Sequence, residues 1–334
     1  MIVALLMLDV QNVTKYISPE FQLSPISFQQ PEGENLALMG VSGSGKTTLL
    51  QLIAGWQQPD SGSIWLQNQK VKGPHEQLVP GHPGLAILQQ TSHLPHYYYI
   101  RDLFQYANVW ESEKTKALLE LCRIHHLLNR KHFEISGGEK QRIALALLLV
   151  ASPSWLLLDE PFSHLDLPNK RILQQILREV SKQLHITTLL CTHNPDEIFG
   201  WADRVLVLEN GKLIQSGTPQ ELYESPNNSY VAGLLGDFIT IPTTIYTHFA
   251  AQSSRINHCA SWIIRPENVI FHPVPTENAV PCVIQNVIFA GRSYKVEVEV
   301  MDTTLFFYTD MPKWTIGAQG FVSIRKGYCL SESD

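Results

Sequence analysis

Eight residues near the N-terminus have the types and spacing of a loop that holds phosphate. Residues 40–47 read Gly-Val-Ser-Gly-Ser-Gly-Lys-Thr, between an expected apolar strand and an expected helix. Glycines at this spacing let backbone N–H groups turn inward around phosphate oxygens, and the start of the helix adds a positive field. Lys46 supplies a cation for the phosphates and the Thr47 hydroxyl is placed for Mg²⁺. The loop predicts phosphate contacts from Gly40, Ser42, Gly43, Gly45, Lys46, Thr47 and Thr48.

Two acidic residues end an apolar segment farther along the chain. Residues 155–160 read Trp-Leu-Leu-Leu-Asp-Glu, which predicts a buried strand with two carboxylates at its end. Adjacent side chains on a strand point to opposite faces, so the two acids should differ in role. Asp159 is expected to hold Mg²⁺ through water, and Glu160 to orient or deprotonate the water that attacks a phosphoryl group. The alternative for Glu160 is a solvated loop residue.

A third stretch precedes an apolar run of helical type. Residues 135–142 read Ile-Ser-Gly-Gly-Glu-Lys-Gln-Arg. A serine followed by two glycines at the start of a helix offers free N–H donors to an anion. The alternative is a helix cap with a turn. The candidate nucleotide-binding residues here are Ser136, Gly137, Gly138 and Glu139.

Together with Thr192-His193, these stretches resemble, in order and spacing, the ATP-binding subunits of ABC transporters, over about residues 8–237. The resemblance implies an ATPase that binds ATP and Mg²⁺. It implies a homodimer that sandwiches two ATP molecules, each between residues 40–47 of one copy and 136–139 of the other. It also implies transmembrane permease subunits as partners, a substrate-binding protein behind them, and a peripheral place on the inner, cytoplasmic face of the membrane.

The resemblance assigns further residues. Gln89 matches the loop glutamine that senses Mg²⁺ and couples to the permease, and Gln90 is the competing choice. Asp166 belongs to the loop that crosses between the two subunits. His193 matches the switch histidine that contacts the γ-phosphate.

Several positions depart from the usual pattern of that family. Tyr16 is the candidate aromatic that stacks on adenine, but Ile17 occupies the usual position. Glu139 stands where glutamine is commonest, Leu147 where an arginine is usual, and His164 where a small residue is usual. None of these changes removes a catalytic group.

The alternation of strand-like and helical segments predicts a mostly parallel α/β sheet for residues 1–237, with a helical subdomain at about 91–150. The expected strands are 8–13, 36–39, 85–88, 155–158, 186–191 and 205–208, and the expected helices are 46–54, 113–125, 138–150 and 169–184. We therefore predict a P-loop NTPase fold of the ABC type.

The texture of the sequence changes after residue 237. Short β-branched segments separated by Gly, Pro and Asp predict a small all-β, OB-like domain at 238–334, with a hairpin turn at 290–292. Residues 211–219 and 264–267 resemble importer ATPases for ions, oxyanions, polyamines and sugars, whose added β domain serves dimer contact or regulation. The alternative is a stability or assembly module that binds no ligand.

The composition of the chain limits its number of domains and its classes of partner. The chain has 334 residues, 44% of them apolar, which allows a sizeable core and about two domains. The net charge of −6 gives no basic excess, so we expect no nucleic-acid partner. The longest apolar run, 143–151, is far shorter than the ~20 residues of a membrane span. Five scattered cysteines without a CxxC pair predict neither a disulfide framework nor a zinc site, and fit a reducing cytosol.

The sequence therefore predicts the ATPase subunit of an ABC importer. One rival is a soluble ABC ATPase of repair or translation, which would be supported by a long coiled-coil insertion or a second ATPase; neither is found in the sequence. Another is a regulator that binds nucleotide and seldom hydrolyses it, against which Glu160 and His193 argue. Met7 is an alternative start to Met1.

Overall fold

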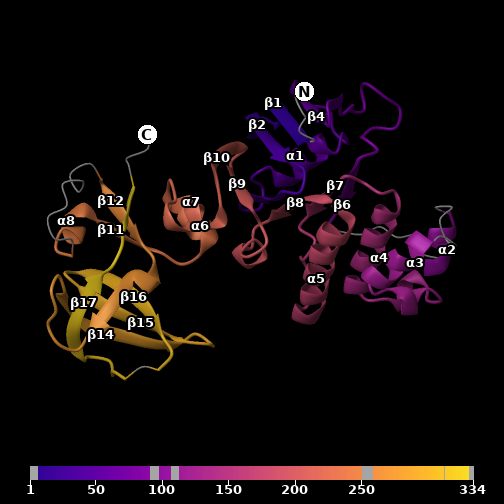
Figure 1. The fold of residues 1–334 in the computed structure, drawn as a ribbon. Helices are drawn as coiled ribbons and strands as arrows, with labels where there is room; N and C mark the ends of the chain where they lie inside the picture. The colour runs from indigo at the N-terminus through magenta and orange to yellow at the C-terminus, as the bar shows by residue number, and fades with distance from the viewer. Residues whose placement is uncertain (1–6, 91–97, 107–112, 250–258, 312, 331–334) are drawn as a thin grey trace, which may run out of the picture. The chain divides into compact units, whose positions relative to one another are not determined.

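The computed structural model of the chain describes residues 7–90, 98–106, 113–249, 259–311 and 313–330 (Figure 1). It divides into two compact units, residues 1–219 and 220–334. Met1, to which Met7 is the alternative start, and the expected beginning of the helical subdomain at 91 lie outside the described residues.

A six-stranded sheet in the order β10-β9-β3-β8-β7-β6 is the centre of the first unit. Its neighbouring strands are parallel except β10, which runs antiparallel to β9. The inner strands are buried on both faces and therefore apolar on both. The strands are β3 (Asn35–Met39), β6 (Leu85–Leu88), β7 (Trp155–Asp159), β8 (Thr187–Thr192), β9 (Arg204–Glu209) and β10 (Lys212–Gly217). Parallel strands end at one edge, so the residues that follow β3, β7 and β8 meet there.

A four-stranded antiparallel sheet, β2-β1-β4-β5, shares a core with the larger sheet. Helix α1 (Lys46–Ile53) contributes Leu49, Leu50 and Leu52 to that core. The strands are β1 (Met7–Ser18), β2 (Phe21–Pro31), β4 (Ser61–Leu66) and β5 (Gln69–Lys70). The β1–β2 hairpin is irregular, with shifts of register beside Val13 and Tyr16.

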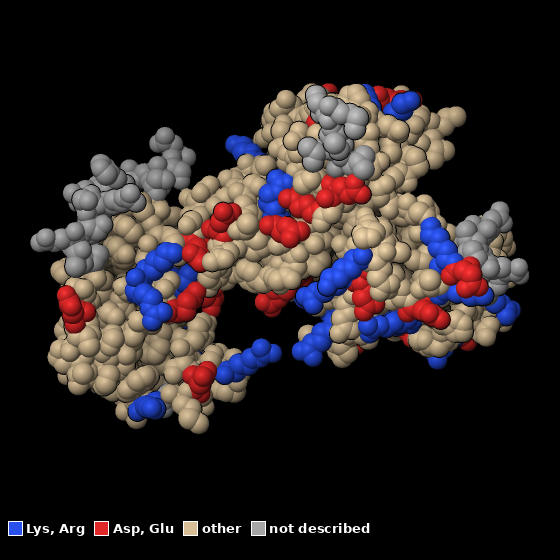
Figure 2. Space-filling model, viewed as in Figure 1, with Lys and Arg blue, Asp and Glu red and all other residues tan. Residues whose placement is uncertain are grey.

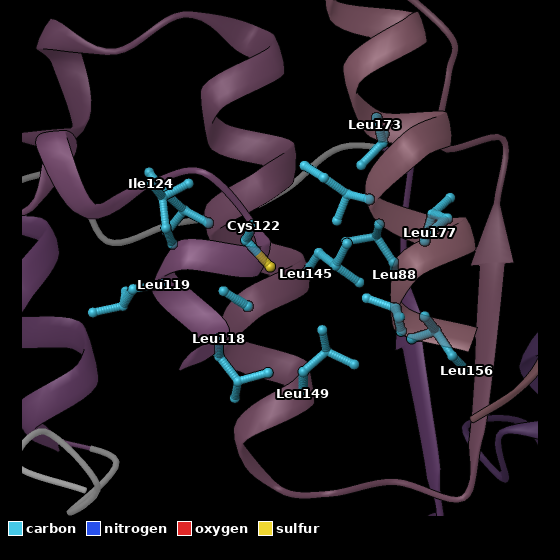
Figure 3. Packing of buried hydrophobic residues seen from close by; sticks show 14 of the residues in the cluster. Leu88, Leu118, Leu119, Cys122, Ile124, Leu145, Leu149, Leu156, Leu173 and Leu177 are labelled. Atoms are coloured by element: carbon cyan, nitrogen blue, oxygen red, sulfur yellow. The ribbon is translucent and has the colours of Figure 1, made fainter. Parts of the chain in front are cut away.

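The other helices of the first unit pack around a second core with β6, β7 and β8 (Figure 1). They are α2 (Ile100–Tyr106), α3 (Glu113–Leu121), α4 (Gly137–Val150) and α5 (Leu167–Leu184). Figure 3 shows Leu118 and Cys122 among leucines of α4 and α5. Helix α3 ends before the predicted residue 125, and Arg123 just beyond it is left-handed at φ 56°. Helix α5 begins earlier than predicted because Asp166 caps it and Pro168 fits its first turn.

The second unit is mostly antiparallel β structure with its own core. A five-stranded sheet, β13-β17-β14-β15-β16, faces a three-stranded one, β11-β12-β18. The β14–β15 hairpin turns at 290–292, which confirms that prediction. The elements are α6 (Pro219–Glu224), α7 (Ser229–Leu235), β11 (Ile239–Pro242), α8 (Thr243–Tyr246), β12 (Ser261–Ile264), β13 (Val269–His272), β14 (Val280–Phe289), β15 (Tyr294–Val300), β16 (Thr303–Thr309), β17 (Gln319–Ile324) and β18 (Tyr328–Leu330).

Arg265 ties α6 and α7 to this β unit. Its guanidinium is almost fully buried and donates to the carbonyl oxygens of Tyr223, Ala232, Gly236 and Asp237 at 3.0–3.1 Å. It also lies 4.0 Å from the centre of the Tyr223 ring. Tyr223 and Ala232 lie in the last turns of α6 and α7, and Gly236 and Asp237 directly follow α7, so Arg265 binds the carbonyl ends of both helices. The division between the units therefore lies before α6, earlier in the chain than residue 237.

The expectation of no disulfide was wrong. Cys259 and Cys329 form a disulfide, with Cα atoms 5.5 Å apart. They are 70 residues apart in sequence and meet because β12, which follows Cys259 closely, pairs with β18. The other three cysteines are buried thiols, and burial raises the pKa of Cys122 to about 12.

Charged side chains of both signs are mixed on the surface. Figure 2 shows Lys and Arg interspersed with Asp and Glu on the face in view. Within the described part of the chain, no helix combines the length and the apolar character that crossing a membrane requires.

Candidate functional site

The phosphate loop runs from the end of β3 to the start of α1, as predicted. Gly45 immediately precedes the helix at φ 104°, a left-handed conformation that glycine adopts without strain. A Cβ on Gly40 would lie 2.4 Å from the carbonyl oxygen of Leu208, so only glycine fits there. The first turn of α1 carries no acidic residue. The start of α1 therefore adds the positive end of its helix dipole to the loop, with the carboxylates of Asp159 and Glu160 close by.

An open hollow of about 570 Å³ lies over this loop. Of the residues predicted to bind nucleotide or to act on it, Ser42, Gly43, Gly45, Lys46, Thr47, Thr48 and Glu160 line the hollow, and Phe21 and Gln90 complete its wall. The volume is of the size of small-molecule sites.

Lys46 is buried beneath the loop. Its Nζ donates to the carbonyl oxygens of Gly40 at 2.8 Å and Val41 at 3.0 Å, and lies 3.7 Å from Glu160 Oε1. An ammonium group held by neutral carbonyls keeps most of its charge available to a phosphate.

Thr47 and Asp159 place two oxygen donors together. The Thr47 hydroxyl donates to Asp159 Oδ1 at 3.1 Å. Burial, with the nearby Glu160 charge, raises the pKa of Asp159, while Thr47 and Lys46 act in the opposite sense. A hydroxyl and a buried carboxylate are the hard ligands that Mg²⁺ prefers, and a cation there would relieve the cost of the buried charge. The donor set therefore fits Mg²⁺.

Glu160 lies between a lysine and a histidine. It follows β7 in a left-handed conformation at φ 45°, with its N–H donating to the carbonyl of Cys191 at 3.0 Å. This turn brings Glu160 Oε1 to 3.2 Å from His193 Nδ1, beyond the end of β8. His193 is about half exposed at the rim. The Glu160 carboxylate, which lines the hollow, thus contacts the His193 imidazole and is placed to act as a general base toward a water in the hollow.

Of the two glutamines after β6, Gln90 lies on the wall of the hollow and Gln89 does not. The Gln90 carbonyl accepts from Gln141 Nε2 at 3.0 Å, and its Nε2 lies 3.4 Å from His164 Nε2. Of the two candidates that the sequence left open, the position of Gln90 on the wall of the hollow favours Gln90. A role for Gln89 remains a prediction.

The aromatic residue at the hollow is Phe21, which sequence analysis did not name. A Cβ on Gly45 would lie 3.0 Å from its ring. Tyr16 and Ile17 are both largely exposed on β1 and do not line the hollow. Ser18 pairs with Phe21 at the end of the β1–β2 hairpin, and the Phe21 ring lies beside Gly45 while Tyr16 stays exposed on β1.

The residues 136–139 form the exposed start of α4. Ser136 caps the helix, and its N–H and hydroxyl donate to Glu139 Oε2 at 2.7 and 2.9 Å. Gly138 is buried against Asn169, where a Cβ would clash at 2.7 Å. None of the four residues 136–139 lines the hollow over the phosphate loop.

Asp166 is an exposed cap of α5. Its Oδ1 accepts from the N–H of Asn169 at 2.9 Å. The carboxylate therefore has a structural task in the single chain.

Comparison with known proteins decides the family. The family model "ABC transporter" matches residues 23–163 and the model "TOBE domain" matches 262–329. The sulfate/thiosulfate import ATP-binding protein CysA of Synechocystis is 32% identical over 304 residues, which cover 88% of this chain and 85% of CysA. The chain belongs to the ABC transporter family, among import ATP-binding subunits with a TOBE domain.

Two further ABC proteins support this placement. The Fe(3+) ions import ATP-binding protein FbpC 2 of Haemophilus influenzae is 34% identical over 253 residues, 74% of this chain and 71% of that protein. The solved structure of CbiO1 from Clostridium perfringens, part of the ABC transporter complex CbiONQ, matches with a TM-score of 0.57 and 27% identity. That match covers 66% of this chain and 91% of CbiO1. The predicted ABC-type α/β fold followed by an all-β domain is thereby confirmed.

Proposed function

We propose that this ABC protein binds and hydrolyses ATP to drive an importer. The observation that carries the proposal is the contact of Glu160 with Lys46 and His193 at the rim of the phosphate-loop hollow. A phosphate-binding cation, a carboxylate and an imidazole meet where the γ-phosphate of a nucleotide on this loop would lie.

In the proposed reaction, Lys46 exchanges its carbonyl partners for phosphate oxygens. Thr47 and Asp159 would hold Mg²⁺, which neutralises phosphate charge when bound. Glu160 orients a water and accepts its proton, while His193 contacts the transferred phosphoryl group. The protein mostly positions groups and balances charge in this reaction class, so small displacements of these side chains should cost turnover.

We further propose that two copies complete each site. Ser136 and Gly137 are exposed and lie off the hollow of their own chain, yet they begin a helix that suits an anion. In a homodimer, residues 136–139 and Asp166 of one copy would close over the ATP held by the other. Tyr16 remains the proposed adenine contact and Phe21 joins it as a second aromatic.

The proposed partners are transmembrane permease subunits, and through them a substrate-binding protein. The chain would act at the cytoplasmic face of the membrane. Exposed Tyr98 and Tyr99, which follow Gln89 and Gln90 in sequence, suit a contact with the permease; Tyr97 lies outside the described residues. The TOBE unit would serve dimer contact or control. The named relatives differ in cargo, so the shared ATPase motifs do not encode it.

A mixing experiment tests the composite site. Lys46→Ala and Ser136→Arg proteins should each be inactive, because each homodimer lacks one half of both sites. Mixed one to one, half of the dimers regain one intact site, so about a quarter of parental turnover should return. If mixing restores nothing while each variant still dimerises, the two-copy site is wrong. If Ser136→Arg alone hydrolyses ATP normally, residues 136–139 have no part in it.

A further inference from the structure

A buried carboxylate that the proposed mechanism does not use lies next to the switch histidine. Glu197 ends the short turn Pro195–Glu197 that follows β8, and it is 9% exposed. Its Oε1 accepts from Lys170 Nζ at 2.7 Å, and its Oε2 accepts from the Thr192 hydroxyl. Both carboxylate oxygens are thus engaged inside the protein.

These contacts fix the backbone on both sides of His193. Thr192 precedes it, and the Thr192 hydroxyl also accepts from the Asn194 N–H at 3.0 Å. The Glu197 N–H donates to the Asn194 carbonyl at 3.1 Å. One carboxylate therefore closes the loop that carries His193.

The second carboxylate oxygen of Glu197, which binds Lys170, connects it to the segment that follows Glu160. Lys170 lies in the first turn of α5, and its N–H donates to the Asp166 carbonyl at 2.9 Å. Residues 161–166 connect Glu160 to that helix start. Glu197 thus joins the His193 loop to the segment after Glu160, and those two residues meet at 3.2 Å.

We propose that Glu197 is a positioning residue, which holds His193 against Glu160 through Thr192 and sets the start of α5 through Lys170. The inference rests on the proposed ATPase function. A buried ion pair adds little net stability over well-packed apolar groups, so stability alone is a weak reason for this one. Its two contacts, with Lys170 and with the Thr192 hydroxyl, instead define where the His193 loop lies.

Two double variants separate positioning from stability. Lys170→Met with Glu197→Gln removes both charges but keeps an acceptor for the Thr192 hydroxyl. Lys170→Met with Glu197→Leu removes both charges and the acceptor. Neither leaves an unpaired buried charge, so both should fold. The variant with Leu at 197 leaves the buried Thr192 hydroxyl without its acceptor and should melt at a lower temperature, so turnover is compared well below both melting transitions. The Leu pair should lose about 10- to 100-fold in kcat with KM for ATP little changed, and the Gln pair should retain most of the turnover.

The matched control is the ion pair of Arg204 with Glu34, at 2.8 Å in the same unit. It lies at the amino-terminal ends of β9 and β3, the opposite edge of the sheet from the site. Arg204→Met with Glu34→Leu should leave kcat at the parental value. The positioning role is refuted if Lys170→Met with Glu197→Leu also turns over at the parental rate. It is refuted as well if this variant and Lys170→Met with Glu197→Gln lose turnover equally. If the parental protein itself does not hydrolyse MgATP, the proposed function fails instead.

Discussion

Replacing Glu160 by glutamine isolates the proton-accepting role of this side chain. Glutamine keeps its length and one acceptor oxygen, so the 3.2 Å contact with His193 Nδ1 can persist, while the charge that faces Lys46 Nζ at 3.7 Å is lost. General-base contributions suggest a fall in kcat of about 100-fold or more. That is about 2.7 kcal/mol of transition-state stabilisation.

ATP should still bind to Glu160→Gln, because Lys46, Thr47 and the loop glycines are untouched and one negative charge has left the hollow. The assay is phosphate release at saturating MgATP, with binding of a fluorescent ATP analogue and size-exclusion chromatography alongside. An ATP-bound dimer should accumulate. Glu76→Gln, in an exposed pair with Lys70, is the control and should keep parental turnover. Hydrolysis by Glu160→Gln near the parental rate would refute the assigned role.

Three further outcomes follow from the same geometry. Lys46→Ala should weaken ATP-analogue binding by about 10- to 100-fold, because the phosphates lose a charged hydrogen-bond donor, and unchanged affinity in the titration would contradict this. Asp159→Asn should abolish Mg²⁺-dependent turnover yet raise the melting temperature of the nucleotide-free protein. Because the pKa of Asp159 is raised, the folded state binds a proton more readily than the unfolded state, so the free energy of unfolding falls as pH rises through that pKa. Thermal melts of Asp159→Asn at several pH values should no longer show this fall. A chain ending at Pro219 should hydrolyse ATP at the parental rate per dimer, and should be more soluble than one ending at Asp237, where α6 and α7 lack Arg265. A chain ending at Pro219 that binds ATP and dimerises without hydrolysis would show a catalytic part for the TOBE unit.

Much of the site could be predicted because its motifs are contiguous. The phosphate loop needs only glycines at fixed spacing between a strand and a helix, and residues 40–47 contain that whole requirement. The same holds for the apolar strand that ends in Asp159 and Glu160, and for the capped helix start at Ser136. In each case the chemistry and the local fold are set by neighbours in the chain.

Contacts between distant segments were decided only by the tertiary structure. Phe21 and not Tyr16 lines the hollow over the phosphate loop, and of the two glutamines after β6 only Gln90 lines it. The pairing of β12 with β18 brings Cys259 to Cys329, against the expectation from cysteine spacing.

The sequence by itself predicted the ABC-type α/β fold, the all-β end of the chain, and the residues that we propose to meet phosphate, Mg²⁺ and water. It could not place Arg265 beneath α6 and α7, or join Glu197 to Lys170 and Thr192. Lys170 and Glu197 look like ordinary surface residues in the sequence, and the motifs that contain Arg265 and Thr192 do not show what these two side chains contact. Burial against partners many residues away gives each its role, and a single sequence does not record which distant segments become neighbours when the apolar faces of strands and helices pack together.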